Sequence, residues 1–393
     1  MKVLSFSYCY PNARRREWGI FVQQRLKALS RLADVEVVSP VGLCWPARRR
    51  AGLAHEETLA GLKVHRPGFF YTPGLFKSHD AWFYATGIKH WLRRHVASYQ
   101  PDVLDVHFIW PDGSAVATLA RELGVPYVIT LRGKIFECTQ PRAQEQCTYA
   151  LKHAAAIISV SRQMAEVARD WGANSERIHV ITNGVNKNLF YPRDRLACRR
   201  KLNLPTDGAL IVAVAHLKPS KGVGDLVEAM PTVGRNVRLV IVGAEAMSGY
   251  AKTLEQRIRQ LHIDQRVILT GAQPFENIPL FLCAGDVCVL ASHREGCPNV
   301  VLESLSCGTP VVASDVGAVR DILRNHTDGI IFPHGNVEKL SAAISRTLNR
   351  SWSPSELHNA PSVVSWSNNA QQVYEVLTSC VDSSLTPQPR ELS

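Results

Sequence analysis

Two carboxylates, Glu295 and Glu303, stand eight positions apart in the segment E-G-C-P-N-V-V-L-E. The run 286–292 before them is apolar and predicts a strand, and residues 300–307 predict a short helix that starts after a Pro-Asn turn. Glu295 then lies in the loop at the carboxyl end of a strand, where open α/β sheets bind ligands, and Glu303 lies one turn inside the helix. Ionised carboxylates accept hydroxyl hydrogen bonds, and a helix amino end favours anions, so the pair predicts a site for a sugar nucleotide.

A simpler interpretation of the same pair is two solvated glutamates at a helix start, where acidic residues are favoured in any case. For two glutamates at arbitrary spacing that interpretation would be preferred. The neighbouring residues favour a ligand site here.

A lysine forms a second element of the predicted site. Between a predicted strand at 210–215 and a predicted helix at 223–230 runs H-L-K-P-S-K-G, which ends in Lys221 and a glycine. A lysine in such a turn can contact a phosphate as a point charge while the helix start donates N–H groups. The sequence contains no D-x-D pair of the kind that holds a diphosphate through a divalent metal. We therefore expect no metal and no cofactor at the site.

The amino-terminal half offers three further candidates. His107 ends a predicted strand at 103–107, and Arg132 follows a predicted strand at 127–130, so both are expected at carboxyl strand ends. A histidine at a strand end is also common in packing, and both interpretations of His107 stay open. Gly19 comes just before the first predicted helix, and its missing Cβ permits a close approach of the backbone.

Strands alternate with helices along both halves, which predicts parallel sheets and an α/β fold. The chain of 393 residues is long enough for two domains. A turn-rich T-N-G-V-N stretch separates the two runs, and we place the boundaries at 1–188, 189–364, a helix at 365–381 and a disordered tail at 382–393.

Composition restricts the function classes. The net charge of +11 belongs to residues 1–190, which hold 25 Lys and Arg against 15 Asp and Glu, whereas residues 191–393 hold 20 against 19. Clusters at 14–16, 48–50 and 89–94 suit anionic lipid headgroups or a diphosphate-linked acceptor. No recognisable RNA- or DNA-binding module accompanies them, which argues against nucleic acid. No run is long enough to span a membrane and no C-x-x-C pair occurs, so we expect a cytoplasmic protein with reduced thiols.

The run 292–315, with P-N-V-V-L-E-S-L-S-C-G-T-P-V-V-A-S-D, resembles the signature of the family 4 retaining glycosyltransferases, and of the bacterial polysaccharide and teichuronic-acid type among them. By position, Glu295 would contact the donor sugar, Glu303 would bind the nucleotide ribose, and Lys221 would neutralise the departing diphosphate. His216 stands where the family usually has an arginine. The backbone stretch implied in sugar and phosphate binding comprises Gly296, Cys297, Pro298, Asn299 and Val300, and all of these except the proline carry an N–H donor.

In the first half the resemblance implies that His107 contacts the donor sugar or the acceptor, and that Gly19 approaches the donor phosphates. Arg132 replaces the histidine of a common T-x-H-G pattern and would bind an acceptor phosphate. The resemblance also implies the GT-B fold: two Rossmann-like domains with parallel sheets face a cleft, and a carboxyl-terminal helix crosses back to the first domain. The expected partners are a nucleotide-sugar donor and a glycan or polyprenyl-diphosphate-linked acceptor, with peripheral membrane association at the inner face of the cell membrane.

Two other functions stay open. Gly222-Val223-Gly224 before a helix, with Glu245 about twenty residues on, imitates part of a dinucleotide-binding fingerprint, although Val227 stands where the third glycine would be. An NAD(P)-dependent oxidoreductase would leave the two glutamates unused. A nucleotide- or glycan-binding protein built on a degenerate transferase is the second alternative, prompted by the departures at His216 and Arg132.

Overall fold

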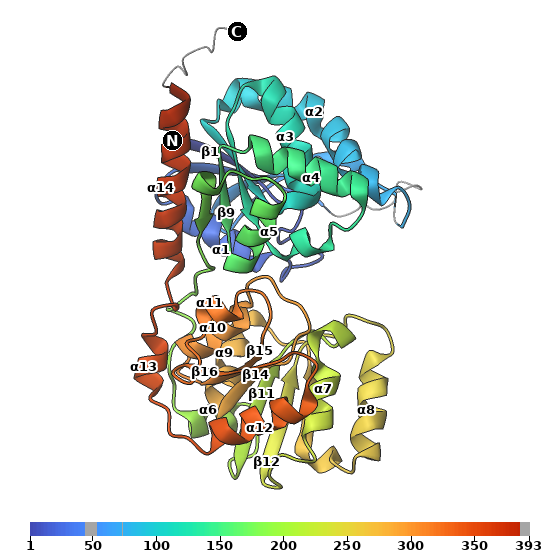
Figure 1. The fold of residues 1–393 in the computed structure, drawn as a ribbon, viewed down its shortest axis with the longest axis vertical. Coiled ribbons are helices and arrows are strands. Elements are labelled where there is room, and N and C mark those ends of the chain that lie inside the picture. Colours follow the sequence, from blue (N-terminus) through green and yellow to red (C-terminus); the bar gives the residue numbers. More distant parts are fainter. Residues whose placement is uncertain (44–52, 73, 386–393) are drawn as a thin grey trace. The chain divides into compact units, whose positions relative to one another are not determined.

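The computed structural model describes residues 1–43, 53–72 and 74–385. The chain forms two compact units: residues 1–183 combine with 366–393, and residues 184–365 form the second unit (Figure 1). The Arg48–Arg50 cluster and the end of the predicted tail, 386–393, lie outside the described residues. Among the described helices, none combines the length and the hydropathy that crossing a bilayer requires.

The first unit is built on an eight-stranded sheet in the order β10-β9-β8-β7-β1-β2-β5-β4. Its strands pair in parallel except β4, which runs antiparallel to β5. A separate parallel pair is formed by β3 (Val41–Leu43) and β6 (Gly68–Phe70). The bounds of the sheet strands are β1 Lys2–Phe6, β2 Asp34–Val38, β4 Glu56–Leu59, β5 Leu62–His65, β7 Val103–His107, β8 Tyr127–Leu131, β9 Ala156–Ser159 and β10 Ile178–Val180.

One face of this sheet is covered by the first and the last helices of the chain, α1 (Ile20–Leu29) and α14 (Trp366–Leu385). Their apolar residues share one core with strand residues such as Val3 and Val35, and α14 lies beside α1 (Figure 1). The helices α2, α3 and α4 pack against one another in sequence order. Their bounds, with that of α5, are α2 Asp80–Tyr99, α3 Ser114–Leu123, α4 Pro141–His153 and α5 Arg162–Asp170.

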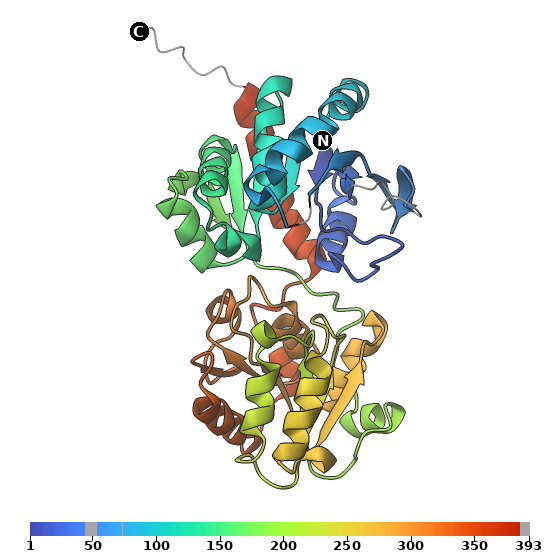
Figure 2. The ribbon, with the colours of Figure 1, turned by 90° about the vertical axis from the view of Figure 1, so that its right-hand side faces the viewer.

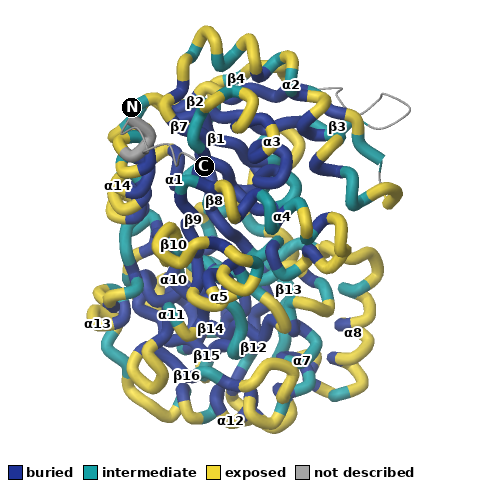
Figure 3. The backbone as a smooth tube through the Cα atoms, turned by 45° about the horizontal axis from the view of Figure 1, so that its top comes forward, coloured by how far each residue is buried: buried dark blue, intermediate teal, exposed yellow. Residues whose placement is uncertain are grey.

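The second unit contains a six-stranded, wholly parallel sheet in the order β13-β12-β11-β14-β15-β16. Its inner strands are short apolar runs such as V-C-V-L in β14 and V-V-A-S in β15, which are buried on both faces as parallel strands usually are (Figure 3). The edge strand β13 is only partly buried. The bounds are β11 Ala209–Val214, β12 Val237–Val242, β13 Val267–Gly271, β14 Val287–Leu290, β15 Val311–Ser314 and β16 Gly329–Phe332.

Helices cover both faces of the second sheet. One core unites α7, α8 and α12 with the strands, and Figure 2 shows α7 and α8 side by side in yellow-green and yellow. A second core on the other face unites α6, α9, α10 and α13 with residues such as Phe190. The helix bounds are α6 Arg195–Lys201, α7 Val223–Ala229, α8 Tyr250–Gln260, α9 Ile278–Ala284, α10 Asn299–Ser306, α11 Val319–Ile322, α12 Val337–Leu348 and α13 Pro354–His358.

The unit boundaries differ slightly from those expected from the sequence. The chain passes from the first unit to the second after Asn183 and returns after Ser365, and α14 then continues to Leu385, four residues beyond the predicted helix end. Part of the segment predicted to be a disordered tail is therefore helical.

Candidate active site

The order of strands in the second sheet reverses between β11 and β14, which are hydrogen-bonded neighbours. After β11, the strands β12 and β13 are added in order on one side of the sheet. After β14, the strands β15 and β16 are added in order on the other side. The loops that leave the carboxyl ends of such a pair diverge, and the crevice between them is where open α/β sheets bind ligands. Lys221 follows β11 and Glu295 follows β14, so both predicted residues stand at this point.

The two side chains meet directly. The Nζ atom of Lys221 lies 2.6 Å from Oε1 of Glu295, and the same oxygen accepts a hydrogen bond of 2.7 Å from Oγ of Ser292. The exposed fractions of the two side chains are 24% for the lysine and 13% for the glutamate, so the pair is part-buried but open to a ligand. Oε2 of Glu295 accepts no hydrogen bond from the residues that the structure describes. One carboxylate oxygen thus fixes the ammonium while the other can receive a hydroxyl.

A glycine allows the two loops to approach so closely. Gly222 has a φ of +63°, and a Cβ on it would lie 1.8 Å from the backbone oxygen of Ala291. The backbone N–H of His293 also donates to the carbonyl of Ser220 at 3.0 Å. Only glycine fits at 222, because it tolerates both the left-handed backbone and the contact. The residue therefore holds Lys221 against the loop that carries Glu295.

The loop of Glu295 is fixed from its other side as well. The N–H of Ala318 donates to the carbonyl of Gly296 at 2.8 Å, and a Cβ on Gly317 would lie 2.4 Å from that oxygen. Gly296 and Cys297 then lead into α10, whose first N–H groups have no partner within the helix. Pro298, Asn299 and Val300 form this amino end, as the sequence predicted for an anion site.

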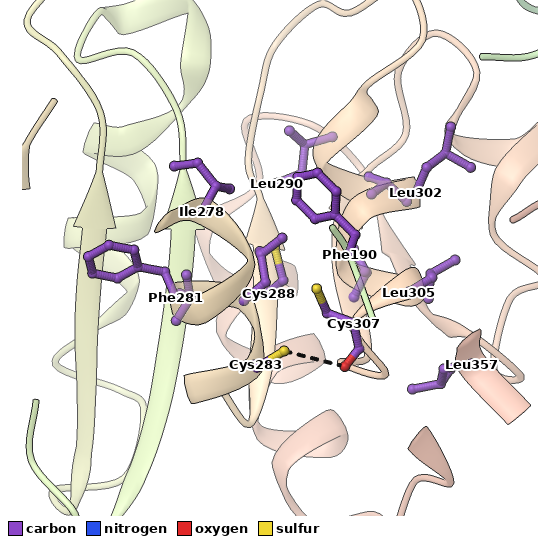
Figure 4. Packing of buried hydrophobic residues seen from close by; sticks show 14 of the residues in the cluster. Phe190, Ile278, Phe281, Cys283, Cys288, Leu290, Leu302, Leu305, Cys307 and Leu357 are labelled. Atoms are coloured by element: carbon purple, nitrogen blue, oxygen red, sulfur yellow. Dashed lines mark hydrogen bonds between the residues drawn. The ribbon is translucent and has the colours of Figure 1, made fainter. Parts of the chain in front are cut away.

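Glu303 projects from the second turn of α10, above the packed core of the unit. Figure 4 shows that core, with Phe190, Leu302 and Leu305 around the helix. The residue as a whole is only partly buried, yet the packed atoms around its carboxyl desolvate it and raise the pKa of Glu303 to about 7. Among the described residues, the side-chain carboxyl of Glu303 has neither a hydrogen-bond nor an ion-pair partner. An acceptor of this kind is suited to ligand hydroxyls.

Glu303→Gln is expected to stabilise the free protein while weakening nucleotide binding. The raised pKa means that the native carboxylate is disfavoured, so the stability of the wild type falls as pH rises from the ordinary carboxyl value towards about 7. The variant should therefore melt at a higher temperature than the wild type at pH 8 and at a similar temperature at pH 5. Its nucleotide affinity should fall roughly ten- to a hundred-fold, because a hydrogen bond to a charged group contributes about 1.5–3 kcal/mol.

Glu255→Gln, on the exposed face of α8, is the matched control and should change neither quantity. A Glu303→Gln protein that binds nucleoside diphosphates as tightly as the wild type would contradict the role in ribose binding. A lower melting temperature at pH 8 would contradict the electrostatic argument.

The remaining candidate of this unit, His216, follows the end of β11 and is exposed. Sequence reasoning overlooked Ser292 and Gly317. Ser292 is the last residue of the predicted strand and lies three residues before Glu295, and that spacing was the signal for it.

In the first unit, His107 and Arg132 meet in a buried polar network. Nη2 of Arg132 lies 3.4 Å from Nδ1 of His107, and Nη1 donates to Oδ1 of Asn183 at 3.0 Å. Nε2 of His107 lies 3.0 Å from Oδ2 of Asp105, which also accepts from Oγ of Ser5 at 2.9 Å. The network connects the carboxyl ends of β7 and β8 to Asn183, the last residue of the segment 1–183.

Burial lowers the pKa of His107 despite the neighbouring carboxylate. Burial alone would raise the pKa of Asp105, but His107, Ser5 and Arg25 together lower it. Both His107 and Arg132 are almost wholly buried, at 0% and 4% exposed. The network therefore positions strand ends in the free protein, and the contacts of His107 and Arg132 with substrate stay predictions.

Gly19 also has a structural reason to be glycine. It precedes α1 with a φ of +77°, and a Cβ on it would lie 2.1 Å from the backbone oxygen of Cys9. This close approach within the unit accounts for the missing side chain without a ligand. Its contact with donor phosphates stays a prediction.

Comparison with known proteins agrees with this geometry. The family model described as glycosyl transferases group 1 matches residues 194–372, and the glycosyl transferase 4-like domain matches residues 19–184. A Bacillus subtilis protein named "Putative teichuronic acid biosynthesis glycosyltransferase TuaC" is 28% identical over 362 residues, which cover 88% of this chain and 89% of that protein. A D-inositol 3-phosphate glycosyltransferase of Acidothermus cellulolyticus is 30% identical over 63% of this chain and 59% of its own length.

Solved structures share the fold across both units. Sucrose-phosphate synthase from Thermosynechococcus elongatus superposes with a TM-score of 0.79 at 21% identity, covering 97% of this chain and 99% of that one. Anabaena HepE in complex with UDP superposes with a TM-score of 0.77 at 18% identity, covering 96% and 99%.

The two α/β units with parallel sheets are those of a GT-B fold. Since the two family models together match most of the chain, it belongs to the family 4-type glycosyltransferases and is a transferase enzyme. The predictions of family, fold class and enzyme class are confirmed, and the oxidoreductase alternative is not supported.

Proposed function

We propose that this protein transfers a hexose from a nucleotide diphosphate sugar to a hydroxyl of a glycan or polyprenyl-diphosphate-linked acceptor, with retention of the anomeric configuration, in surface polysaccharide biosynthesis. The observation that carries the proposal is the contact of Lys221 with Glu295 at the carboxyl ends of β11 and β14. Glu303, on the helix that follows, supplies the second carboxylate.

The comparisons support the donor class. HepE structures contain UDP and UDP-glucose, and the relatives described above are named as glycosyltransferases. In this chain the ribose would lie at Glu303, the diphosphate at Lys221 and the amino end of α10, and the sugar hydroxyls at Oε2 of Glu295. The three groups sit on loops and a helix that begin at neighbouring strands, as one extended ligand requires.

Stabilisation of the leaving group is the main catalytic effect in this proposal. As the bond between the sugar and the diphosphate breaks, negative charge grows on the phosphate oxygen. An ammonium and a helix amino end placed there bind the transition state more tightly than the ground state. Glu295 has two tasks: it holds the ammonium through Oε1, and it would orient the sugar through Oε2.

The acceptor would bind to the first, basic unit. Arg14, Arg15 and Arg16 are exposed beside a turn and offer positive charge to a phosphorylated lipid acceptor or an anionic membrane surface. Lys89 and Arg93 instead share Glu122, with contacts of 2.8 and 2.9 Å, so part of that cluster is neutralised within the protein. The arginine triplet is the stronger candidate for association with the inner face of the cell membrane.

Donor selection and stereochemistry test the proposal directly. The protein is mixed with uridine, guanosine and adenosine diphosphate sugars, first without acceptor to measure thermal stabilisation and slow hydrolysis, and then with polyprenyl-diphosphate-linked glycans. We expect one nucleotide series to raise the melting temperature by mass action and to support transfer. Proton NMR of the product should show the anomeric configuration of the donor. Nucleotide binding without hydrolysis or transfer across the panel would favour a binding protein, and an inverted product would exclude retention.

Transfer is expected to proceed in the presence of a chelator. The proposed charge stabilisation comes from Lys221 and α10, and the sequence lacks the D-x-D pair with which a divalent ion would hold the diphosphate. Initial rates measured with EDTA should match those with added Mg²⁺ or Mn²⁺ within about two-fold. A rate that is abolished by EDTA and restored by Mn²⁺ would contradict metal-independent transfer.

A further inference from the structure

A cluster of two histidines and a glutamate lies in the first unit, away from the residues of the predicted site. Glu36 comes from β2, His65 from the end of β5 and His95 from α2, and their nearest nitrogen and oxygen atoms all lie within 4.8 Å of one another. Nε2 of His65 is 2.7 Å from Oε2 of Glu36, and Nε2 of His95 is 2.9 Å from the same oxygen. Three ligand atoms thus converge on one point.

The spacing suits a small borderline cation. Zn²⁺ binds imidazole nitrogen at about 2.0–2.1 Å and carboxylate oxygen at about 2.0–2.2 Å, usually with four ligands in a tetrahedron. Ligand atoms around such an ion are separated by about 3.3 Å, the edge of a tetrahedron with those bond lengths. The two nitrogen–oxygen distances, 2.7 and 2.9 Å, need to lengthen by only about half an ångström to reach this separation.

Both imidazoles are held in orientation by their surroundings. Nδ1 of His65 lies 3.2 Å from Oε2 of Glu56, which stands opposite it in the antiparallel pair of β4 and β5. A carboxylate on the non-ligating nitrogen is the usual second partner of a zinc-bound histidine. The ring of His95 stacks on Trp91 and on Tyr99, with centroids 4.8 and 5.7 Å away and interplanar angles of 11° and 18°.

We propose that the first unit binds one Zn²⁺ ion through Nε2 of His65, Nε2 of His95 and a carboxylate oxygen of Glu36, with water as the fourth ligand. The ion would fasten α2 to the strands β2 and β5. Its role would be structural and separate from sugar transfer, whose proposed diphosphate-binding groups lie in the second unit.

Two neighbouring properties bear on this site. Burial lowers the pKa of His95, which favours the neutral imidazole that a metal requires. Lys63 opposes the ion, since its Nζ lies 3.9 Å from Oε1 of Glu36, but this lysine is about half exposed and also contacts Glu56 at 3.1 Å. It can stay with Glu56 and the first oxygen of Glu36 while Oε2 binds the metal.

The test uses the full-length protein, stripped with a chelator and dialysed, and titrated with Zn²⁺ by calorimetry and with Co²⁺ by visible absorption. We expect one equivalent of each ion to bind, with the intense visible bands of four-coordinate Co²⁺, and Zn²⁺ to raise the melting temperature. His95→Asn and Glu36→Gln should abolish the one-to-one binding and the Co²⁺ spectrum. His90→Asn, an exposed histidine on the same helix, is the matched control and should bind like the wild type.

A wild-type protein that binds no stoichiometric ion would overturn the proposal, as would a His95→Asn variant that binds like the wild type. Melting curves and circular dichroism of the metal-free variants establish that they are folded, so that lost binding reports on the ligands. Nucleotide-induced stabilisation, measured on the same samples, should be equal with and without Zn²⁺. That readout separates this site from the proposed sugar-transfer function.

Discussion

Replacing Lys221 with alanine is expected to lower the turnover number about 10²–10³-fold. This is the usual cost of removing one preorganised group that stabilises charge in a transition state. The ammonium lies 2.6 Å from Glu295 in the free protein, so it already stands where the proposed diphosphate would leave. Steady-state kinetics with the donor identified by the binding panel measure the effect.

The matched control for this variant is Lys252→Ala, which removes an exposed lysine on α8 in the same unit. The Lys221 pair is part-buried, and its loss should lower the free energy of unfolding by only about 1 kcal/mol. We expect affinity to fall more for nucleoside diphosphates than for monophosphates. Equal turnover in wild type and Lys221→Ala would remove the lysine from the mechanism.

Glu295→Ala is expected to lower kcat/KM by about 10²-fold or more. The change removes both the oxygen that fixes Lys221 and the oxygen proposed to orient the sugar, and misplacement at a reacting centre can cost about 10²-fold. Glu295→Gln keeps the shape of the side chain and both hydrogen bonds that Oε1 accepts, but it removes the charge. Its kcat/KM should therefore fall less than that of Glu295→Ala. Kinetics of both variants give the comparison.

Binding measurements separate the tasks of the two residues. In Glu295→Ala the affinity for the complete nucleotide sugar should fall relative to that for the nucleoside diphosphate alone, because the lost contact is with the sugar. Glu255→Ala is the control. If the variant loses affinity for both ligands equally, Glu295 acts on the diphosphate through Lys221, and the proposed sugar contact is wrong.

Strong periodicity made much of the fold predictable. The strand at 103–107 has the predicted bounds, because a short run rich in valine and leucine leaves little ambiguity. The 20-residue helix α2 was not predicted, although Ala81, Tyr84 and Ile88 follow helical spacing and are buried. Frequent aromatic residues in that stretch obscured the pattern.

Contacts between distant strands could not be predicted in the same way. Lys221 and Glu295 were each predicted in a loop after a strand, and the family resemblance implied that both bind the donor; their 2.6 Å contact agrees with a common site. The burial of His107 and Arg132 was not foreseen, because the network that closes over them includes Asn183 at the end of the unit. Glu36, His65 and His95 belong to no spacing motif at all, since the pairing of β2 with β5 and the packing of α2 bring them together.

The chain enters and leaves the second unit at positions that lie side by side. The N–H of Val185 donates to the carbonyl of Val364 at 2.9 Å, and Val185 forms a parallel bridge with Ser365. Residues 184–365 are thus one uninterrupted segment whose two ends are hydrogen-bonded to each other, as in a domain inserted into another domain. The first unit has no such independence: a chain ending at 183 would lack α14 and leave the apolar side of α1 bare. During synthesis, the second unit, which carries Lys221 and both glutamates, can thus fold before the first unit. The first unit is synthesised earlier but must wait for α14.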